Sequence, residues 1–317
     1  MSAGWVAGVT RARALRTRCL GAEGIGEVAA SPTLDDALRY LAATPYRHDV
    51  TSVVTPAEGQ RAVSATLLWH LRVLAGWQPA TGADAIRALA AGFEISNTEH
   101  HLRALAADPR ALPRPHFPPY RLGALAIAWT RFARTRTPSE LRNALAASVW
   151  GDPGGDSAAA VATGMRVSAA LRLAATVPDA ARWAAARLAL LFGREVFVVG
   201  RRMPDVSTRR VARLLGPRAV SAGSYADFRQ ALPATARWLL KDVDEAADLW
   251  RAEARWWKAV ERDGRELLRR SHFGPQPVVG AVAVLSADAW RTRGALELAG
   301  RGGGLGDWPA EVLDAPG

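Results

Sequence analysis

The chain has 317 residues, of which 49% are hydrophobic, and a formal net charge of +11. This composition excludes a wholly disordered chain and leaves room for two or three domains with substantial cores. No apolar run reaches the length of about 18 residues that a membrane-spanning helix needs. Arginines stand near the N-terminus, where a signal peptide would carry its apolar stretch. We therefore expect a cytoplasmic protein whose membrane association, if any, is peripheral.

The single cysteine, Cys19, excludes an internal disulfide and a multi-cysteine zinc site. The positive charge is almost all arginine, because Lys241 and Lys258 are the only lysines. An acidic partner is one explanation of such a charge. The arginines are spread along the whole chain and are not gathered into one tract, so the charge favours an acidic partner only weakly.

The first predicted element is a helix in the stretch TRARALRTRCL, residues 10–20. On a helical wheel its apolar residues form one arc, which comprises Val9, Ala12, Leu15, Cys19 and Leu20. Arg11 and Arg18 project from the opposite side, whereas Arg13 and Arg16 lie at the edge of the arc. Arginines at such an edge usually pair with carboxylates. Asp36 and Glu94, or their counterparts elsewhere in the chain, are the expected partners of Arg13 and Arg16.

Apolar residues recur at three and four positions along most of the remaining chain, which is the spacing of helices. One such stripe comprises Val63, Leu67, Leu71 and Leu74, and another comprises Leu249, Trp256, Val260 and Leu267. Segments that break helices cluster at 109–119, 151–155, Pro204 and 300–306. Alternating strand patterns are nearly missing. The sequence therefore predicts an all-α protein.

Three helix starts share one register, which indicates an internal repeat. The starts are Thr33-Leu-Asp-Asp36, Thr137-Pro-Ser-Glu140 and Ser224-Tyr-Ala-Asp227. In each, a hydroxyl can cap the first turn, and the acid three residues later suits the positive end of the helix dipole. A leucine follows the cap by eight residues and a hydroxyl residue follows it by eleven. The pairs are Leu41 and Thr44, Leu145 and Ser148, and Leu232 and Thr235.

A second acid follows each start at a similar distance. These acids are Glu94, Glu195 and Asp288, and each begins a short segment that ends in arginine. The repeat predicts three helical domains, at residues 1–112, 113–205 and 206–317, and the last domain ends in a flexible tail.

The sequence contains no constellation that we assign to catalysis, and it predicts neither a cofactor nor a metal ion. His100 and His101 are adjacent, so on a helix they point about 100° apart and cannot easily share an ion. The glycine-rich stretch 301–306 lacks the spacing of a phosphate-binding loop. Trp250, Trp256 and Trp257 lie on an arginine-rich helix and could stack on nucleobases. A role in the core is the favoured interpretation of the tryptophans, with Trp69, Trp129 and Trp183 in apolar helical stretches.

Four stretches, in this order and spacing, resemble the C-type subunit of archaeal-type (A/V-type) rotary ATPases, which is related to the d-type subunit of vacuolar ATPases. The stretches are ARALRTRCL, SPTLDDALRYLAATPY, GFEISNTEHHLRAL and FGPQPVVGAVAVLSADAWRTRGALELAGRGGGL. The third resembles the acid-x-x-Asn helix of that family, through Glu94 and Asn97. The fourth resembles the family's FGPEP segment with its acidic position and arginine, here Asp288 and Arg293. The chain departs from the family where Val198 and Arg291 replace the asparagine in the other two repeats.

The resemblance implies three similar helical domains arranged as a funnel, without an active site of its own. It implies a central-stalk subunit that links the rotor shaft subunits, of D and F type, to the proteolipid ring in the membrane and transmits torque between ion flow and nucleotide chemistry. The basic faces would meet acidic stalk surfaces or anionic lipid headgroups on the inner face of the cell membrane, and no nucleic acid is expected. The candidate repeat or interface residues are Arg13, Arg16, Asp36, Glu94, Asn97, Glu140, Glu195, Asp227, Asp288 and Arg293.

Two other functions remain alternatives. An arginine-rich helical protein that binds nucleic acid would show an affinity that falls steeply with salt. An enzyme with an unrecognised helical active site has no positive sequence feature behind it.

Overall fold

A computed structural model describes residues 4–50, 53, 55–107 and 117–303. The regular elements of these residues are helices, as the sequence predicts, and the described residues contain no β-strand. The helices of the first half are α1 (Gly4–Ala14), α2 (Gly21–Ala30), α3 (Leu34–Ala42), α4 (Pro56–Gly76), α5 (Ala80–Leu89), α6 (Ala91–Leu105), α7 (Trp129–Phe132) and α8 (Pro138–Ala146). Those of the second half are α9 (Ala158–Thr176), α10 (Ala181–Gly193), α11 (Asp205–Leu215), α12 (Pro217–Val220), α13 (Tyr225–Ala231), α14 (Ala234–Arg237), α15 (Leu249–Arg269) and α16 (Pro275–Ala299).

Shorter helical turns join these helices. They are η1 (Leu15–Arg18), η2 (Gly123–Leu125), η3 (Pro178–Ala180), the π-helix η4 (Arg194–Val198), η5 (Trp238–Leu240) and η6 (Ala246–Asp248). The breaker-rich segment at 109–119 falls largely outside the described residues, as does most of the predicted C-terminal tail.

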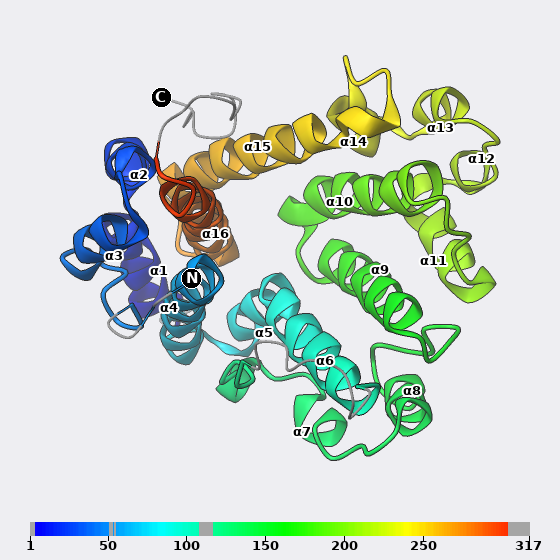
Figure 1. Ribbon diagram of the computed structural model, residues 1–317, viewed down its shortest axis with the longest axis horizontal. Coiled ribbons are helices and arrows are strands. Elements are labelled where there is room, and N and C mark those ends of the chain that lie inside the picture. Colours follow the sequence, from blue (N-terminus) through cyan, green and yellow to red (C-terminus); the bar gives the residue numbers. More distant parts are fainter. Residues whose placement is uncertain (1–3, 51–52, 54, 108–116, 304–317) are drawn as a thin grey trace. The chain divides into compact units, whose positions relative to one another are not determined.

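The chain divides into two compact units, the first made of residues 1–86 and 257–317 and the second of residues 87–256. In the first unit, α16 packs against α1, α2 and α4 (Figure 1). The predicted stripe Val63, Leu67, Leu71 and Leu74 is buried on α4. Residues 278–285, which are apolar enough for a strand, lie within helix α16 and are buried there. The three-domain division and the funnel stay predictions.

In the second unit, α9 and α10 lie side by side, and α9 also contacts α6 and α11 (Figure 1). One part of the core surrounds Trp150, Phe132 and Leu145, and a second part surrounds Phe192 and Phe228. These rings are fully or almost fully buried, as large side chains between alanine-rich helices should be.

The three predicted helix starts are real and share their local geometry. Thr33, Thr137 and Ser224 are the N-caps of α3, α8 and α13, and each hydroxyl accepts a hydrogen bond from the backbone N–H three residues later. The leucine eight residues after each cap is completely buried in all three cases, at Leu41, Leu145 and Leu232. The repeated spacing therefore describes a repeated structural unit, a capped helix anchored by one leucine.

The third capped helix is two residues shorter than the other two, because of Pro233. α3 and α8 run through Ala42 and Ala146, nine residues after their caps, whereas α13 ends at Ala231. Proline stands at this ninth position in the third repeat, and it has no N–H to donate and disfavours helical backbone in the residue before it. Leu232 accordingly has an extended backbone, with ψ 140°.

The arginine-rich stretch differs from its predicted single helix. Helix α1 ends at Ala14, and residues 15–18 form the 3₁₀ turn η1. Val9, Ala12 and Leu15 are buried as predicted. A 3₁₀ turn has 3.0 residues per turn, so the residues after Ala14 leave the wheel of an α-helix. Arg16 and Arg18 are exposed as a result.

Candidate functional site

The carboxylate of Glu94 accepts hydrogen bonds from three N–H groups, the nearest of which lies 33 residues further along the chain. Glu94 is on α6 and is 1% exposed. One oxygen, Oε1, accepts the N–H of Ala128 at 2.8 Å and the indole N–H of Trp150 at 2.9 Å, and Oε2 accepts the N–H of Ile127 at 2.5 Å. Ala128 is the residue before α7. The acid therefore accepts hydrogen bonds from N–H groups at a helix start and from the indole N–H of a buried tryptophan.

Asp288 on α16 repeats this arrangement in the other unit. It is 2% exposed. Oδ2 accepts the N–H of Leu20 at 2.9 Å and the hydroxyl of Tyr46 at 2.8 Å, while Oδ1 accepts the N–H of Gly21 at 3.0 Å. Leu20 and Gly21 start α2. We call each set, one buried carboxylate with two consecutive backbone N–H groups and one aromatic donor, a carboxylate clamp.

The aromatic donors occupy equivalent positions, thirteen residues after the caps Thr33 and Thr137. The turn that carries them is also repeated. Thr44 and Ser148 donate to the leucine carbonyls three residues earlier, at 2.7 and 2.8 Å. Their hydroxyls then accept the N–H of Tyr46 and Trp150, at 3.2 and 3.1 Å. The hydroxyl position found in the sequence repeat thus shapes the turn that aims an aromatic ring at the acid.

Burial dominates the electrostatics of the Asp288 clamp. Desolvation raises the pKa of Asp288 above the usual carboxyl value, while the N–H groups of Leu20 and Gly21 and the Tyr46 hydroxyl act in the opposite direction. Desolvation also raises the pKa of Tyr46. The pKa of the nearby Cys19 thiol rises well above its usual value, first through desolvation and then through the charges of Asp288 and Glu261. Cys19 is therefore a poor nucleophile at neutral pH.

The third acid, Glu195, does not form a clamp of this kind. It lies in the π-helix η4, and its carboxylate pairs with Arg201 at 3.0 Å. Its side chain is 15% exposed, so it is less buried than the other two acids. A regular α-helix does not continue through this segment, which separates Glu195 from the helical register of Glu94 and Asp288.

The position three residues after each acid also differs between repeats. Asn97 extends the Glu94 clamp, since its amide donates to the carbonyl of Tyr120 at 2.9 Å and its oxygen accepts the N–H of the same residue at 2.7 Å. Arg291 instead forms a buried ion pair with Glu261 at 2.5 Å. Val198 is 51% exposed. The three residues at this position therefore make different contacts.

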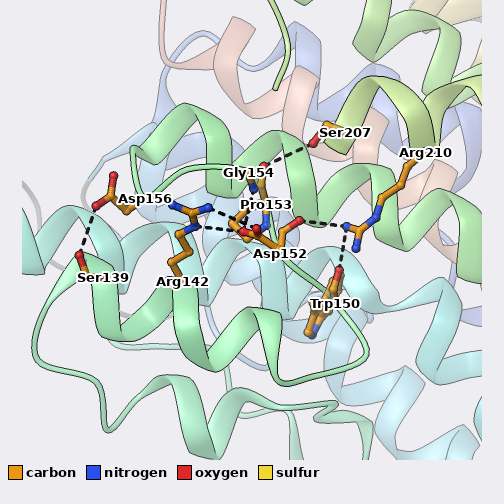
Figure 2. A network of polar contacts seen from close by, with 9 residues as sticks. All are labelled: Ser139, Arg142, Trp150, Asp152, Pro153, Gly154, Asp156, Ser207 and Arg210. Atoms are coloured by element: carbon orange, nitrogen blue, oxygen red, sulfur yellow. Dashed lines mark hydrogen bonds and ion pairs between the residues drawn. The ribbon is translucent and has the colours of Figure 1, made fainter. Parts of the chain in front are cut away.

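A polar network holds the turn that carries Trp150 (Figure 2). Arg142 of α8 donates twice to Asp152, at 3.0 and 3.2 Å, and Asp152 also accepts the N–H of Gly154 at 3.0 Å. Arg210 of α11 donates to the carbonyls of Trp150 and Asp152, at 3.4 and 3.2 Å. The Arg142 guanidinium and the Gly154 N–H lower the pKa of Asp152. This network joins α8 and α11 to the Glu94 clamp.

The outer ends of the same turn are tied by two weaker hydrogen bonds. Ser207 of α11 donates to the carbonyl of Pro153 at 3.4 Å, and Ser139 of α8 donates to Asp156 at 3.3 Å (Figure 2).

The structure does not give Arg13 a carboxylate partner. Its guanidinium donates to the carbonyl of Arg270 at 2.7 Å and lies over the ring of Phe273, 5.5 Å from the centroid. Arg11 was expected to project into solvent, but it lies over Trp77 at 5.6 Å and is half-buried. The predicted pairing of Arg13 was wrong, because the wheel shows only which face a side chain occupies and not which groups pack against that face.

The other predicted residues lie at helix starts or on the surface. Asp36 and Asp227 accept hydrogen bonds from the hydroxyls of their cap residues, at 2.6 and 2.7 Å, and Glu140 accepts the N–H of Arg136 at 2.8 Å. Arg293 is exposed on α16. These contacts stabilise helix ends and do not bring the residues into one site.

Sequence reasoning missed the donors of the clamps and one helix start. Tyr46 and Trp150 share a spacing of thirteen from their caps, a signal that was available in the sequence. Thr55 and Glu58 form a reciprocal capping box at the start of α4, and the motif Thr55-Pro-Ala-Glu58 states it directly. The backbone donors at residues 20–21 and 127–128 carry no sequence signal.

The tryptophans divide between core and surface. Trp183 is buried as expected, but Trp69 is 38% exposed, and its ring lies 5.3 Å from that of His48. Trp256 donates its indole N–H to the carbonyl of Trp183 at 2.9 Å. Trp257 stacks on Trp290. Neither of the adjacent tryptophans on α15 therefore presents an open platform for a base.

Metal-binding and membrane-spanning features are both missing from the described residues. These residues contain no cluster of three or more His, Cys, Asp or Glu side chains arranged to hold a metal ion. Within the same residues, every helix is too short or too polar to cross a membrane.

Residues 8–162 match the family model of the ATP synthase (C/AC39) subunit. This match, over just under half of the chain, supports a relation to the C-type subunit of A/V-type ATP synthases. The matched segment includes the whole Glu94 clamp and the donors Leu20, Gly21 and Tyr46 of the Asp288 clamp. The C/AC39 match therefore covers two of the three repeated helix starts. A search of curated proteins gives no match.

Proposed function

We propose that this protein is a non-catalytic central-stalk subunit of a rotary ATPase or ATP synthase. In this role it links the rotor shaft subunits, of D and F type, to the proteolipid ring and transmits torque between them. It would be attached peripherally to the inner face of the cell membrane through the complex, with anionic lipid headgroups as a further contact. The family match over residues 8–162 is the observation that carries the proposal.

The clamps fit a part that transmits force. Each buried carboxylate accepts three hydrogen bonds, with at least one on each oxygen, and these bonds join it to a second segment of the chain. Charge-assisted hydrogen bonds are stronger than neutral ones and fix the geometry of the segments they join. A subunit loaded by a rotating shaft needs such fixed joints inside each unit.

Deletion of the gene tests the coupling role. Membrane vesicles from the deletion strain should lose ATP-driven ion uptake, while detached catalytic heads continue to hydrolyse ATP. Restoring the wild-type gene should restore uptake. Vesicles that still pump at the wild-type rate without this protein would contradict the proposal.

The alternative, binding of nucleic acid, rests on the arginine content. Many arginines are already engaged, as in the pairs of Arg142 with Asp152 and of Arg187 and Arg194 with Glu253. A salt titration of single-stranded DNA binding decides between the two functions, since true phosphate contacts give an affinity that falls steeply with salt.

A further inference from the structure

An open cavity of about 620 Å³ lies in the second unit, where α13, α14 and η5 meet. Its lining includes three cationic side chains, Arg229, Arg237 and Lys241, and one acidic side chain, Asp242. Trp238 contributes an aromatic wall, and Arg182 lies over that ring at 4.2 Å from the centroid. The cavity is therefore a basic depression on the surface, with a size suited to a few side chains of a ligand.

The position of Arg237 in the repeat indicates which anion the cavity takes. Arg237 stands thirteen residues after the cap Ser224, as Tyr46 and Trp150 stand thirteen after theirs. In the first two repeats the side chain at this position donates to a carboxylate. In the third repeat this side chain, Arg237, is again a donor. The third acid, Glu195, pairs with Arg201 and not with Arg237.

Pro233 explains how Arg237 is held. Because the proline ends α13 early, carbonyls at the end of that helix lack their usual N–H partners. Arg237 satisfies two of them, since its Nε donates to Leu232 at 2.9 Å and its Nη2 donates to Gln230 at 3.3 Å. These bonds fix the guanidinium in the cavity wall, and its Nη1 has no hydrogen bond within the part of the chain that the structure describes.

Lys241 is the second donor without a counter-ion. It is exposed, and its ammonium has no ion pair within the described residues. Arg229 differs, because it pairs with Asp244 at 2.7 Å. Arg237, which backbone carbonyls fix, and the exposed Lys241 together give the cavity two cations for carboxylates, one of them pre-organised.

We propose that this cavity binds carboxylate side chains of an acidic segment of a partner protein, with Arg237 and Lys241 as the donors. The repeat favours carboxylate over phosphate, because the equivalent positions in the other two repeats meet carboxylates. The proposal goes beyond the coupling role and does not depend on it, since the binding is measured with the purified chain alone.

The first test is a titration of the full-length protein with a fluorescein-labelled octaglutamate peptide, followed by fluorescence anisotropy. We expect Lys241→Glu to weaken binding at least 10-fold and Lys241→Arg to retain it within about 3-fold. Arg72→Glu is the matched control, because it makes the same change of net charge at an exposed position on α4 of the other unit. That variant should weaken binding less than 2-fold. Equal losses for Lys241→Glu and Arg72→Glu would overturn the proposal.

The second test uses the scarcity of lysine. A carbodiimide joins an amine to a carboxylate without a spacer, and Lys241 and Lys258 are the only lysine amines of the chain. With the octaglutamate peptide bound, mass spectrometry should find the adduct at Lys241. Labelling that misses Lys241 at a saturating peptide concentration would overturn the proposal. So would a labelled oligothymidylate of eight nucleotides that binds more tightly than the peptide and loses its affinity in Lys241→Glu.

Discussion

The two clamps show what a single buried acid does in this protein. Glu94 and Asp288 are almost completely buried, a state that costs several kcal/mol for an isolated charge. Each acid is compensated by three N–H or O–H donors, and the donors come from backbone at a helix start and from one ring. The same acid satisfies groups that would otherwise be buried without partners. Replacement of its acceptor oxygens should therefore cost more than replacement of a surface carboxylate.

Glu94→Gln tests this cost. The amide keeps one acceptor oxygen but turns an NH₂ group toward backbone N–H donors, so two donors meet where one carboxylate oxygen lay. We expect the free energy of unfolding to fall by about 2–4 kcal/mol, measured by urea denaturation. The control is Asp35→Asn, which removes an acid that is 82% exposed and should leave the denaturation midpoint unchanged. A Glu94→Gln midpoint equal to that of the wild type would contradict the clamp.

Asp288 and Asp152 should give pH dependences of opposite sign. Burial raises the pKa of folded Asp288 above 3.8, so the folded state holds this proton more tightly than the unfolded state does. Its contribution to stability is complete below pH 3.8 and declines as the pH rises through the folded pKa. For Asp152 the pKa is lowered, so its contribution is present above pH 3.8 and is lost on acidification.

Urea denaturation between about pH 3 and pH 7 measures both dependences. The stability advantage of the wild type over Asp288→Asn should shrink as the pH rises, whereas its advantage over Asp152→Asn should shrink as the pH falls. A stability difference that changes in the same direction with pH for both variants would contradict the opposite pKa shifts of Asp288 and Asp152.

At the scale of the helix, most of the fold follows from spacing. The periodicity predicts the long helices, and the three hydroxyl caps predict the starts of α3, α8 and α13. Local patterns carry this information because a cap and its first turn lie within four residues. The clamps could be predicted only in part, since Leu20 and Gly21 reach Asp288 through backbone N–H groups that nearly every residue type carries. The partner of Arg13 was missed for the same reason, because it is a backbone carbonyl.

The cap of α8 gives a direct test of the repeated helix start. Thr137→Ala removes the acceptor of the Glu140 N–H and should lower the free energy of unfolding by about 1 kcal/mol. Ser224→Ala should cost a similar amount at α13, where the Asp227 N–H loses its acceptor. Thr137→Ser keeps the hydroxyl and is the control. Equal stability of the alanine and serine variants at residue 137 would contradict the cap, as measured by thermal and urea denaturation.

The contact between α15 and α16 depends on two glycines. A Cβ on Gly280 would lie 2.5 Å from the carbonyl oxygen of Gly264 and 2.9 Å from the backbone nitrogen of Leu268, so the helices would have to move apart. We expect Gly280→Ala to destabilise the protein by about 1–3 kcal/mol. Gly26→Ala, on α2, meets no atom within 4 Å and should be neutral or stabilise by up to about 1 kcal/mol. Denaturation of the two variants side by side checks this contrast, and equal shifts would contradict it.

At the scale of the whole chain, the family match includes all of the Glu94 clamp but only part of the Asp288 clamp. The match covers residues 8–162, whereas the acid of the Asp288 clamp lies outside that range. The first capped helix is thus held by an acid from the far end of the sequence.

The composition of the particle that contains this protein tests the central-stalk role. The protein would be tagged at its natural locus and purified from membranes in mild detergent, and its partners identified by mass spectrometry. We predict recovery of the shaft subunits and the proteolipid of a rotary ATPase in constant ratio to the tagged protein. Recovery of the tagged protein without these subunits, alone or with nuclease-sensitive nucleic acid, would contradict the central-stalk role.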